Sequence, residues 1–173
     1  FSRTVILMLV GITVILFFLF RSLIMPLYII GSLIVTYYTS LAVNEMIFVN
    51  IMGYSGISWA VPFFAFVILI ALGVDYSIFL MDRFNEYKSL SVSEAILLAM
   101  QKMGTVILSA ALILGGTFAA MLPSGMLSLV QISTIVIVGL MLYAVVILPL
   151  FIPVMVKIFG KANWWPFIKS HME

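Results

Sequence analysis

The sequence contains no cysteine and a single histidine, His171, the third residue from its end. Without cysteine, the chain forms neither disulfide bonds nor thiolate metal sites. Charged residues make up only 8% of the 173 residues, whereas soluble domains carry about 25%. An ordinary soluble domain is therefore excluded. The net charge of +2 is also too small to indicate a nucleic-acid partner.

The same absences argue against catalysis inside a membrane. Serine proteolysis needs a base beside the nucleophile, and His171 lies in the tail. Aspartyl catalysis needs two carboxylates that share a site, but only one acidic residue lies well inside an apolar run. No cluster of histidine, cysteine or acidic residues has the make-up of a metal site. We therefore expect no enzyme activity and neither a metal nor an organic cofactor.

Hydrophobic residues dominate the chain at 65% and are gathered in five long runs. A helix crosses the hydrocarbon core of a bilayer with about 20 apolar residues. The runs that meet this length occupy residues 4–20, 23–43, 59–81, 104–122 and 127–156. The sequence therefore predicts an all-α membrane protein, with a bundle of five transmembrane helices as one domain over residues 1–173. Two prolines near the end of the last run, Pro149 and Pro153, are expected to kink it or to carry it out of the membrane.

The basic residues predict how this bundle is oriented. If the first run crosses from outside to inside, seven of the eight lysines and arginines fall on the inner side, and only Arg3 falls outside. Basic residues favour the cytoplasmic face of a membrane. We therefore predict that the N-terminus of this chain lies outside and its C-terminus in the cytoplasm. The segment "NWWPF" (163–167) is typical of an aromatic anchor at the interface.

Residues 91–103 predict one further helix on the cytoplasmic side. Ser91 and Glu94 have the spacing of a capping box. The apolar residues between Val92 and Met103 recur on one face at helical spacing. A helix with this pattern lies along the membrane interface. We expect an interfacial amphipathic helix that leads into the fourth span, although a plain connecting helix fits the pattern as well.

One acidic residue, Asp75, lies well inside a predicted span, in the stretch "LIALGVDYSIFLMDRF" (69–84). An ionised aspartate at the centre of a lipid-facing helix costs roughly 2.5–3.5 kcal/mol. It avoids this cost by facing other helices, by finding a partner or by taking up a proton. An aspartate that changes its protonation state can load a proton from one side of the membrane and release it to the other.

The neighbouring residue, Tyr76, is suited to the same task. A tyrosine hydroxyl donates a hydrogen bond to an ionised carboxylate and accepts one from a protonated carboxyl group. Adjacent residues of a helix point about 100° apart, so we expect the two side chains to bond groups on other helices rather than each other. The alternative for Asp75 is a hydrogen bond between helices that serves packing alone.

Gly73, Asp75 and Tyr76, together with the inner stretch up to Arg83, resemble a motif of the MmpL-like branch of the resistance–nodulation–division (RND) transporters. The resemblance extends over essentially the whole chain. Such transporters have two similar halves, each with a lead helix, an extracellular domain and five further helices. The resemblance implies that this chain is the five-helix block after the second extracellular domain, half of an RND transmembrane domain. The start at Phe1 without a methionine fits such a piece.

The resemblance also implies a function. The chain would be the C-terminal membrane half of an exporter of lipids or hydrophobic compounds, a secondary transporter of the bacterial plasma membrane driven by the proton-motive force. Asp75 and Tyr76 would form half of an intramembrane proton relay facing an equivalent pair, with Gly73 supporting the motif. The coupling ion is the proton, and no cofactor is implied.

The implied partners are the missing N-terminal half and extracellular domains of the same transporter, membrane lipids, and a hydrophobic or lipid substrate. The sequence leaves the substrate unknown and self-association into an oligomer open. An alternative in the same superfamily is a non-transporting, sterol-sensing-type sensor or scaffold, which would need Asp75 only for packing.

Overall fold

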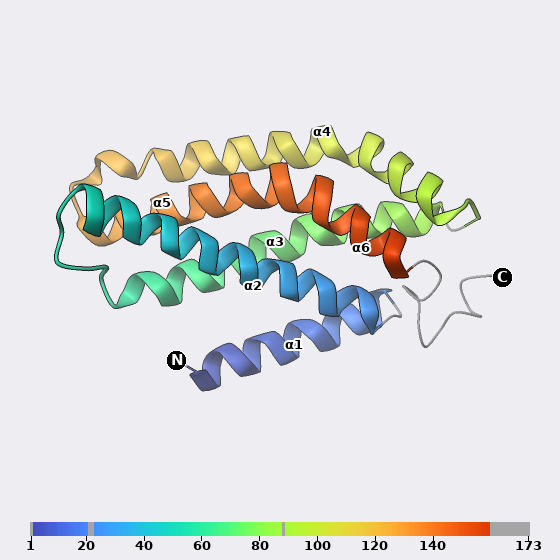
Figure 1. Ribbon diagram of the computed structural model, residues 1–173, viewed down its shortest axis with the longest axis horizontal. Coiled ribbons are helices and arrows are strands. Elements are labelled where there is room, and N and C mark those ends of the chain that lie inside the picture. Colours follow the sequence, from blue (N-terminus) through green and yellow to red (C-terminus); the bar gives the residue numbers. More distant parts are fainter. Residues whose placement is uncertain (1, 21–22, 88, 160–173) are drawn as a thin grey trace.

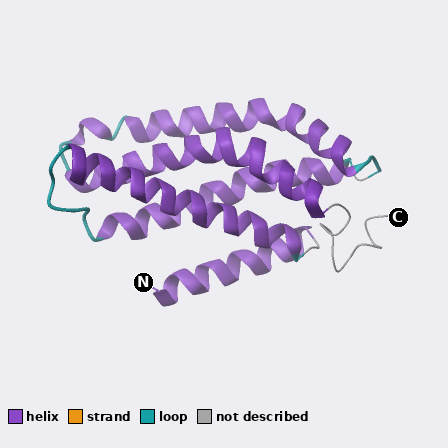
Figure 2. Ribbon diagram, viewed as in Figure 1, coloured by secondary structure: helices purple, strands orange, loops and turns teal. Residues whose placement is uncertain are grey.

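The computed structural model describes residues 2–20, 23–87 and 89–159, and every regular element in these ranges is a helix (Figure 2). The long helices and their continuations are α1 (Ser2–Phe20), α2 (Ile24–Glu45), η1 (Met46–Ile51), α3 (Ala60–Glu86), α4 (Val92–Ala119), η2 (Leu122–Ser124), α5 (Leu127–Leu142), η3 (Tyr143–Phe151) and α6 (Ile152–Phe159). In the described ranges, five helical stretches are long and apolar enough to cross a membrane. The predicted all-α membrane bundle is therefore confirmed.

The five stretches run antiparallel to their neighbours in the chain and lie side by side (Figure 1). The helices α2, α3 and α5 pack against one another, α4 covers α3 and α5, and α1 lies at the edge against α2. Only 11% of the most apolar stretch of α1 and 17% of that of α4 are buried, whereas 56% of that of α2 is buried. The bundle thus has a three-helix core, and two outer helices that leave most of their apolar surface uncovered.

Residues 91–103 are helical, as predicted, but they are not a separate element. The hydroxyl oxygen of Ser91 accepts a hydrogen bond from the backbone N–H of Glu94 at 3.3 Å, which is the expected N-terminal cap. From there α4 continues without a break to Ala119. No proline interrupts it, so the fourth span and the predicted interfacial segment form one helix. Lys102, expected on the inner side beyond the span, consequently lies inside a helix of 28 residues.

The expected irregularity of the last span is present around Pro149. The helix widens into the π-helical segment η3, which contains Pro149, and α6 then continues to Phe159. Proline has no backbone N–H for the regular helical hydrogen bond, and a π-helical turn is one way for a helix to absorb such a break. The three segments α5, η3 and α6 together form one membrane-length stretch.

Basic residues in the described part of the chain lie toward opposite ends of the bundle. Arg3 begins α1, while Arg83 is in the last turn of α3 and Lys157 in that of α6, at the other end (Figure 1). Several residues used to predict the orientation lie outside the described residues, namely Arg21, Lys88, Lys161, Lys169 and the aromatic segment 163–167. The orientation in the membrane stays a prediction.

The core contains a row of polar side chains along α2. Ser32, Thr36, Ser40 and Asn44 follow at four-residue intervals, so they lie on one face of the helix, and all four are buried. The hydroxyl groups of Ser32, Thr36 and Ser40 donate to backbone carbonyl oxygens of α2 itself at 2.6–2.8 Å. Because each donor is satisfied locally, the row lies in the apolar core without orphaned hydroxyl protons.

At the Asn44 end of this row, the side chain of Gln131 on α5 holds the loop 52–59. The backbone N–H of Ser58 donates to Gln131 Oε1 at 3.1 Å, and Gln131 Nε2 donates to the carbonyl oxygen of Gly56 at 3.4 Å. Asn44 Nδ2 donates to the backbone carbonyl oxygen of Gln131 at 3.3 Å. One buried carboxamide thus connects the loop to α5, beside the end of α2.

We expect Gln131→Met to loosen this loop. The change leaves the Ser58 N–H and the Gly56 carbonyl group without their partner, which costs about 1–3 kcal/mol. Hydrogen exchange of the Ser58 amide in the full-length protein should then be at least roughly tenfold faster. Thr134→Val is the control, because Thr134 donates only within its own helix, to Val130 at 2.8 Å. Equal exchange in both variants would contradict the role of Gln131.

Candidate functional site

The helix α3 has one exposed face. The exposed residues form a stripe with helical spacing: Phe64, Ala71, Asp75, Phe79, Asp82 and Glu86. We call these six residues the open stripe of α3. The opposite side of the helix packs into the core through residues that include Gly73, Tyr76 and Ser77. The helix therefore turns one line of side chains toward the bundle of this chain and another line away from it.

Asp75 lies on the open stripe and far from either end of the helix. The helix continues for eleven residues beyond it to Glu86, which is about 16 Å at 1.5 Å per residue. Its side chain is exposed on the surface of the described chain. Toward the end of the helix, the same stripe carries Asp82 and Glu86, and the Glu86 carboxylate pairs with Arg83 at 2.7 Å. Asp75 is thus the acid of α3 that lies at membrane depth.

Tyr76 points into the core rather than along the open stripe. Its side chain is 3% exposed, and its buried hydroxyl oxygen has no hydrogen-bond partner within the described part of the chain. Tyr76 therefore does not bond its neighbour Asp75, and within the described residues its hydroxyl group also lacks the expected partner on another helix. A partner from a further segment stays a prediction. An unpaired buried hydroxyl group is costly, so this group is a candidate for a partner that enters during function.

Gly73 has a packing role that the structure makes explicit. A Cβ atom at this position would collide with the side chain of Leu33 on α2. Leu33 is itself 2% exposed, so it has little room to move. Glycine at position 73 thus allows α2 and α3 to approach closely, two residues away from Asp75.

Sequence reasoning missed a cluster of buried hydroxyl groups beside the motif. The hydroxyl groups of Ser77 on α3 and Tyr143 at the start of η3 form a hydrogen bond. We call these two residues the hydroxyl cluster. The sequence provides only a weak indication of this cluster. Tyr143 is the one tyrosine in the run 127–156, and a tyrosine hydroxyl group buried in an apolar run needs a hydrogen-bond partner.

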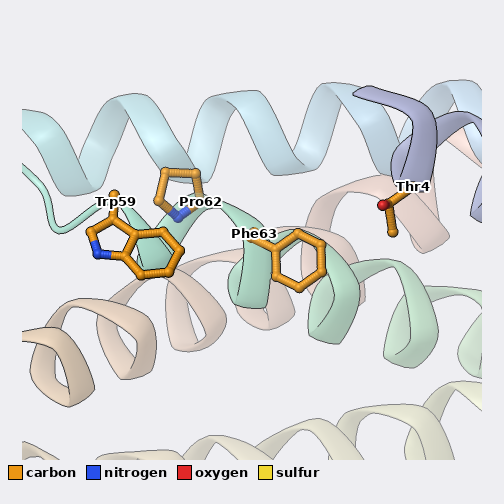
Figure 3. A pocket seen from close by; sticks show the side chains of 4 residues that line it. All are labelled: Thr4, Trp59, Pro62 and Phe63. Atoms are coloured by element: carbon orange, nitrogen blue, oxygen red, sulfur yellow. The ribbon is translucent and has the colours of Figure 1, made fainter. Parts of the chain in front are cut away.

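A pocket of about 430 Å³ lies elsewhere, where the start of α1 meets the start of α3. Thr4, Trp59, Pro62 and Phe63 line it, as Figure 3 shows. Its lining is almost wholly apolar, and it is separated from Asp75 by several turns of α3. In the described residues, no three histidine, cysteine or acidic side chains gather to hold a metal ion.

Five apolar helices of membrane length, packed around a core that contains polar side chains, define a multi-pass membrane protein. The chain matches the MMPL family over residues 2–173 and belongs to that family. The match confirms the resemblance to the MmpL-like branch that the motif around Asp75 indicated.

Three relatives show how far the similarity extends. The membrane protein YdgH of Bacillus subtilis is 59% identical over 96% of this chain, which covers 19% of that protein. The acyltrehalose exporter MmpL10 of Mycobacterium tuberculosis is 31% identical over 86% of the chain, covering 15% of that protein. The sulfolipid-1 exporter MmpL8 of the same organism is 33% identical over 87%, covering 14%. The chain thus spans a fifth or less of the length of these relatives.

Proposed function

We propose that the chain is the C-terminal membrane half of a proton-driven exporter of lipids or hydrophobic compounds, with Asp75 and Tyr76 as half of its proton relay. Membership of the MMPL family supports a transporter. Two relatives are named as exporters, one of acyltrehalose and one of sulfolipid-1, which supports a lipid substrate. The proposed location is the bacterial plasma membrane, with the N-terminus of the chain outside.

One observation carries the relay. Asp75 is the acid of α3 at membrane depth, and it is exposed on the open stripe, away from the bundle of this chain. A lipid-facing carboxylate at this depth would be costly, so a second segment should cover the stripe in the whole protein. In the proposal, that segment belongs to the other half of the transporter. A carboxyl group enclosed between two halves can exchange its proton with one side of the membrane at a time.

The alternative function, a sensor or scaffold that does not transport, is favoured by a different observation. The hydroxyl cluster and the Gln131 contacts hold the bundle together without any charged group, as a purely structural bundle requires. Under this alternative, Asp75 would pack against another helix and would never need to change its charge.

The two functions are separated by transport in a defined system. The full-length protein is placed in liposomes with a fluorescent acyltrehalose as probe and an imposed pH gradient, acid on the outer face. We expect the probe to cross toward the acid side, and we expect nigericin, which collapses the gradient, to stop it. Movement that ignores nigericin would contradict proton coupling. Binding of the probe without movement, under either condition, would favour the sensor.

A further inference from the structure

The hydroxyl cluster joins α3 to the stretch formed by α5 and η3 at one point. Tyr143 is 2% exposed and Ser77 is 0% exposed, so water does not compete for this contact. Tyr143 begins η3 at the end of α5, and Ser77 belongs to α3. A single tyrosine hydroxyl group thus holds α3 from a neighbouring helix.

This contact acts on the same face of α3 as Gly73. Gly73 and Ser77 are four residues apart and so lie one turn apart on one face. Gly73 packs against Leu33 of α2, and Ser77 is hydrogen-bonded to Tyr143 of η3. Two contacts one turn apart, one steric and one by a hydrogen bond, fix the rotation of α3 about its own axis.

Asp75 lies midway between these two contacts in the sequence. It is two residues from Gly73 and two from Ser77, so at 100° per residue it leaves the helix about 160° away from the face they form. The rotation that keeps Ser77 on Tyr143 is therefore the rotation that keeps Asp75 on the open stripe. A small turn of α3 would move the carboxyl group sideways along the surface of the bundle.

Tyr143 also stands where its own helix changes. The regular helix α5 ends at Leu142, and Tyr143 is the first residue of η3. Wide π-helical turns inside α-helices occur frequently at functional sites, and they let the two parts of a helix turn relative to each other. The hydroxyl cluster connects this irregular point to the rotation of α3.

We propose that Tyr143 is a positioning residue that aims Asp75, acting through Ser77. The proposal concerns the direction of the Asp75 side chain, and its significance for transport rests on the proposed function. Other titratable side chains on α3 and on the elements packed against it also bear on Asp75. They are Tyr28, Tyr37, Tyr38, Glu45, Tyr76, Asp82, Arg83, Glu86, Glu94, Lys102 and Tyr143. All of them are unchanged in the decisive comparison below except the tyrosine that is replaced.

The test compares two tyrosine hydroxyl groups in the full-length protein in lipid. Tyr143→Phe removes the proposed contact. Tyr37→Phe is the control, because Tyr37 is also buried and also bonds α3, but at its outer end, through the Pro62 carbonyl oxygen at 3.0 Å. The readout is the infrared carboxyl band of Asp75, isolated by subtracting the spectrum of Asp75→Asn, followed against pH.

We expect Tyr143→Phe to shift the pH midpoint of this band by at least about 0.5 pH unit, a roughly threefold change in the protonation equilibrium. Tyr37→Phe should leave the midpoint at its wild-type position. An equal midpoint in all three proteins, or equal shifts in both variants, would overturn the proposal. Loss of export in Asp75→Asn together with an unshifted band in Tyr143→Phe would support the proposed function and contradict only the positioning role of Tyr143.

A second variant keeps the test decisive if Tyr143→Phe fails to fold. Ser77→Ala removes one hydroxyl oxygen from the other end of the same contact and should shift the Asp75 band in the same direction. Because the two residues share one hydrogen bond, Tyr143→Phe with Ser77→Ala should shift the band no further than the larger single change. Additive shifts, or no shift in Ser77→Ala, would contradict the proposal.

Discussion

Proton-driven export by the full-length protein should fall by roughly a hundredfold or more when Asp75 is replaced by asparagine. The carboxamide keeps the size of the side chain but cannot take up and release a proton, and a positioned proton-transfer group is typically worth 10²–10⁴ in rate. Asp75 is exposed on the surface of this chain, so the change creates no cavity and should not unfold the bundle. The measurement is the initial rate of probe movement under an imposed pH gradient.

The same helix provides a matched control for this prediction. Asp82 also lies on the open stripe, seven residues further along, and is exposed. Seven residues are close to two helical turns, so Asp82 points in nearly the same direction about 10 Å nearer the end of the helix. We expect Asp82→Asn to keep most of the transport rate. A comparable loss in both variants would indicate a general charge effect of the stripe, and full activity in Asp75→Asn would contradict the relay.

The second large effect concerns stability at Gly73. A methyl group at this position collides with the buried side chain of Leu33, and overpacking of this kind costs about 1–3 kcal/mol. Gly31→Ala is the control on α2, because a Cβ atom there meets nothing within 4 Å. That change should instead stabilise by up to about 1 kcal/mol through helix propensity. Reversible unfolding of the full-length protein in mixed micelles measures both.

A compensating variant tests whether the collision is the cause. Leu33→Ala alone leaves a cavity and costs about 2–5 kcal/mol. In that background, Gly73→Ala meets free space, so it should cost little further or recover part of the loss. Fully additive costs would show that Gly73 matters for a reason other than its contact with Leu33.

Much of the fold could be predicted from the sequence because lipid imposes a simple rule on length and polarity. The predicted span 23–43 corresponds to α2, which ends at Glu45, and the predicted span 104–122 lies mostly within α4. What residues 91–103 pack against could not be predicted. An apolar face over residues 91–103 is required equally by a helix on the membrane surface and by a helix that packs one side on a bundle. Only its neighbours decide between them, here through the buried Ala95, Ile96 and Ala99.

The candidate site was predictable in part for a similar reason. A charged residue inside a membrane span is costly in free energy and rare. Asp75 could therefore be recognised as a candidate from its own position in the sequence. The hydroxyl cluster does not stand out, because serine and tyrosine are individually ordinary in an apolar run. Its meaning arises from a contact between residues 77 and 143, which are 66 positions apart. No local pattern encodes that pairing.

The polar row of α2 has a consequence for how the protein is made. This row gives α2 the lowest hydropathy of the five membrane-length stretches, so it is the segment least able to remain in lipid alone. Its contact with α5, such as that between Asn44 and Gln131, joins residues 87 positions apart. During synthesis α2 therefore enters the membrane well before α5 exists to cover it. We therefore expect α2 to stay beside the translocation machinery, or against α1 and α3, until α5 is available to cover its polar row.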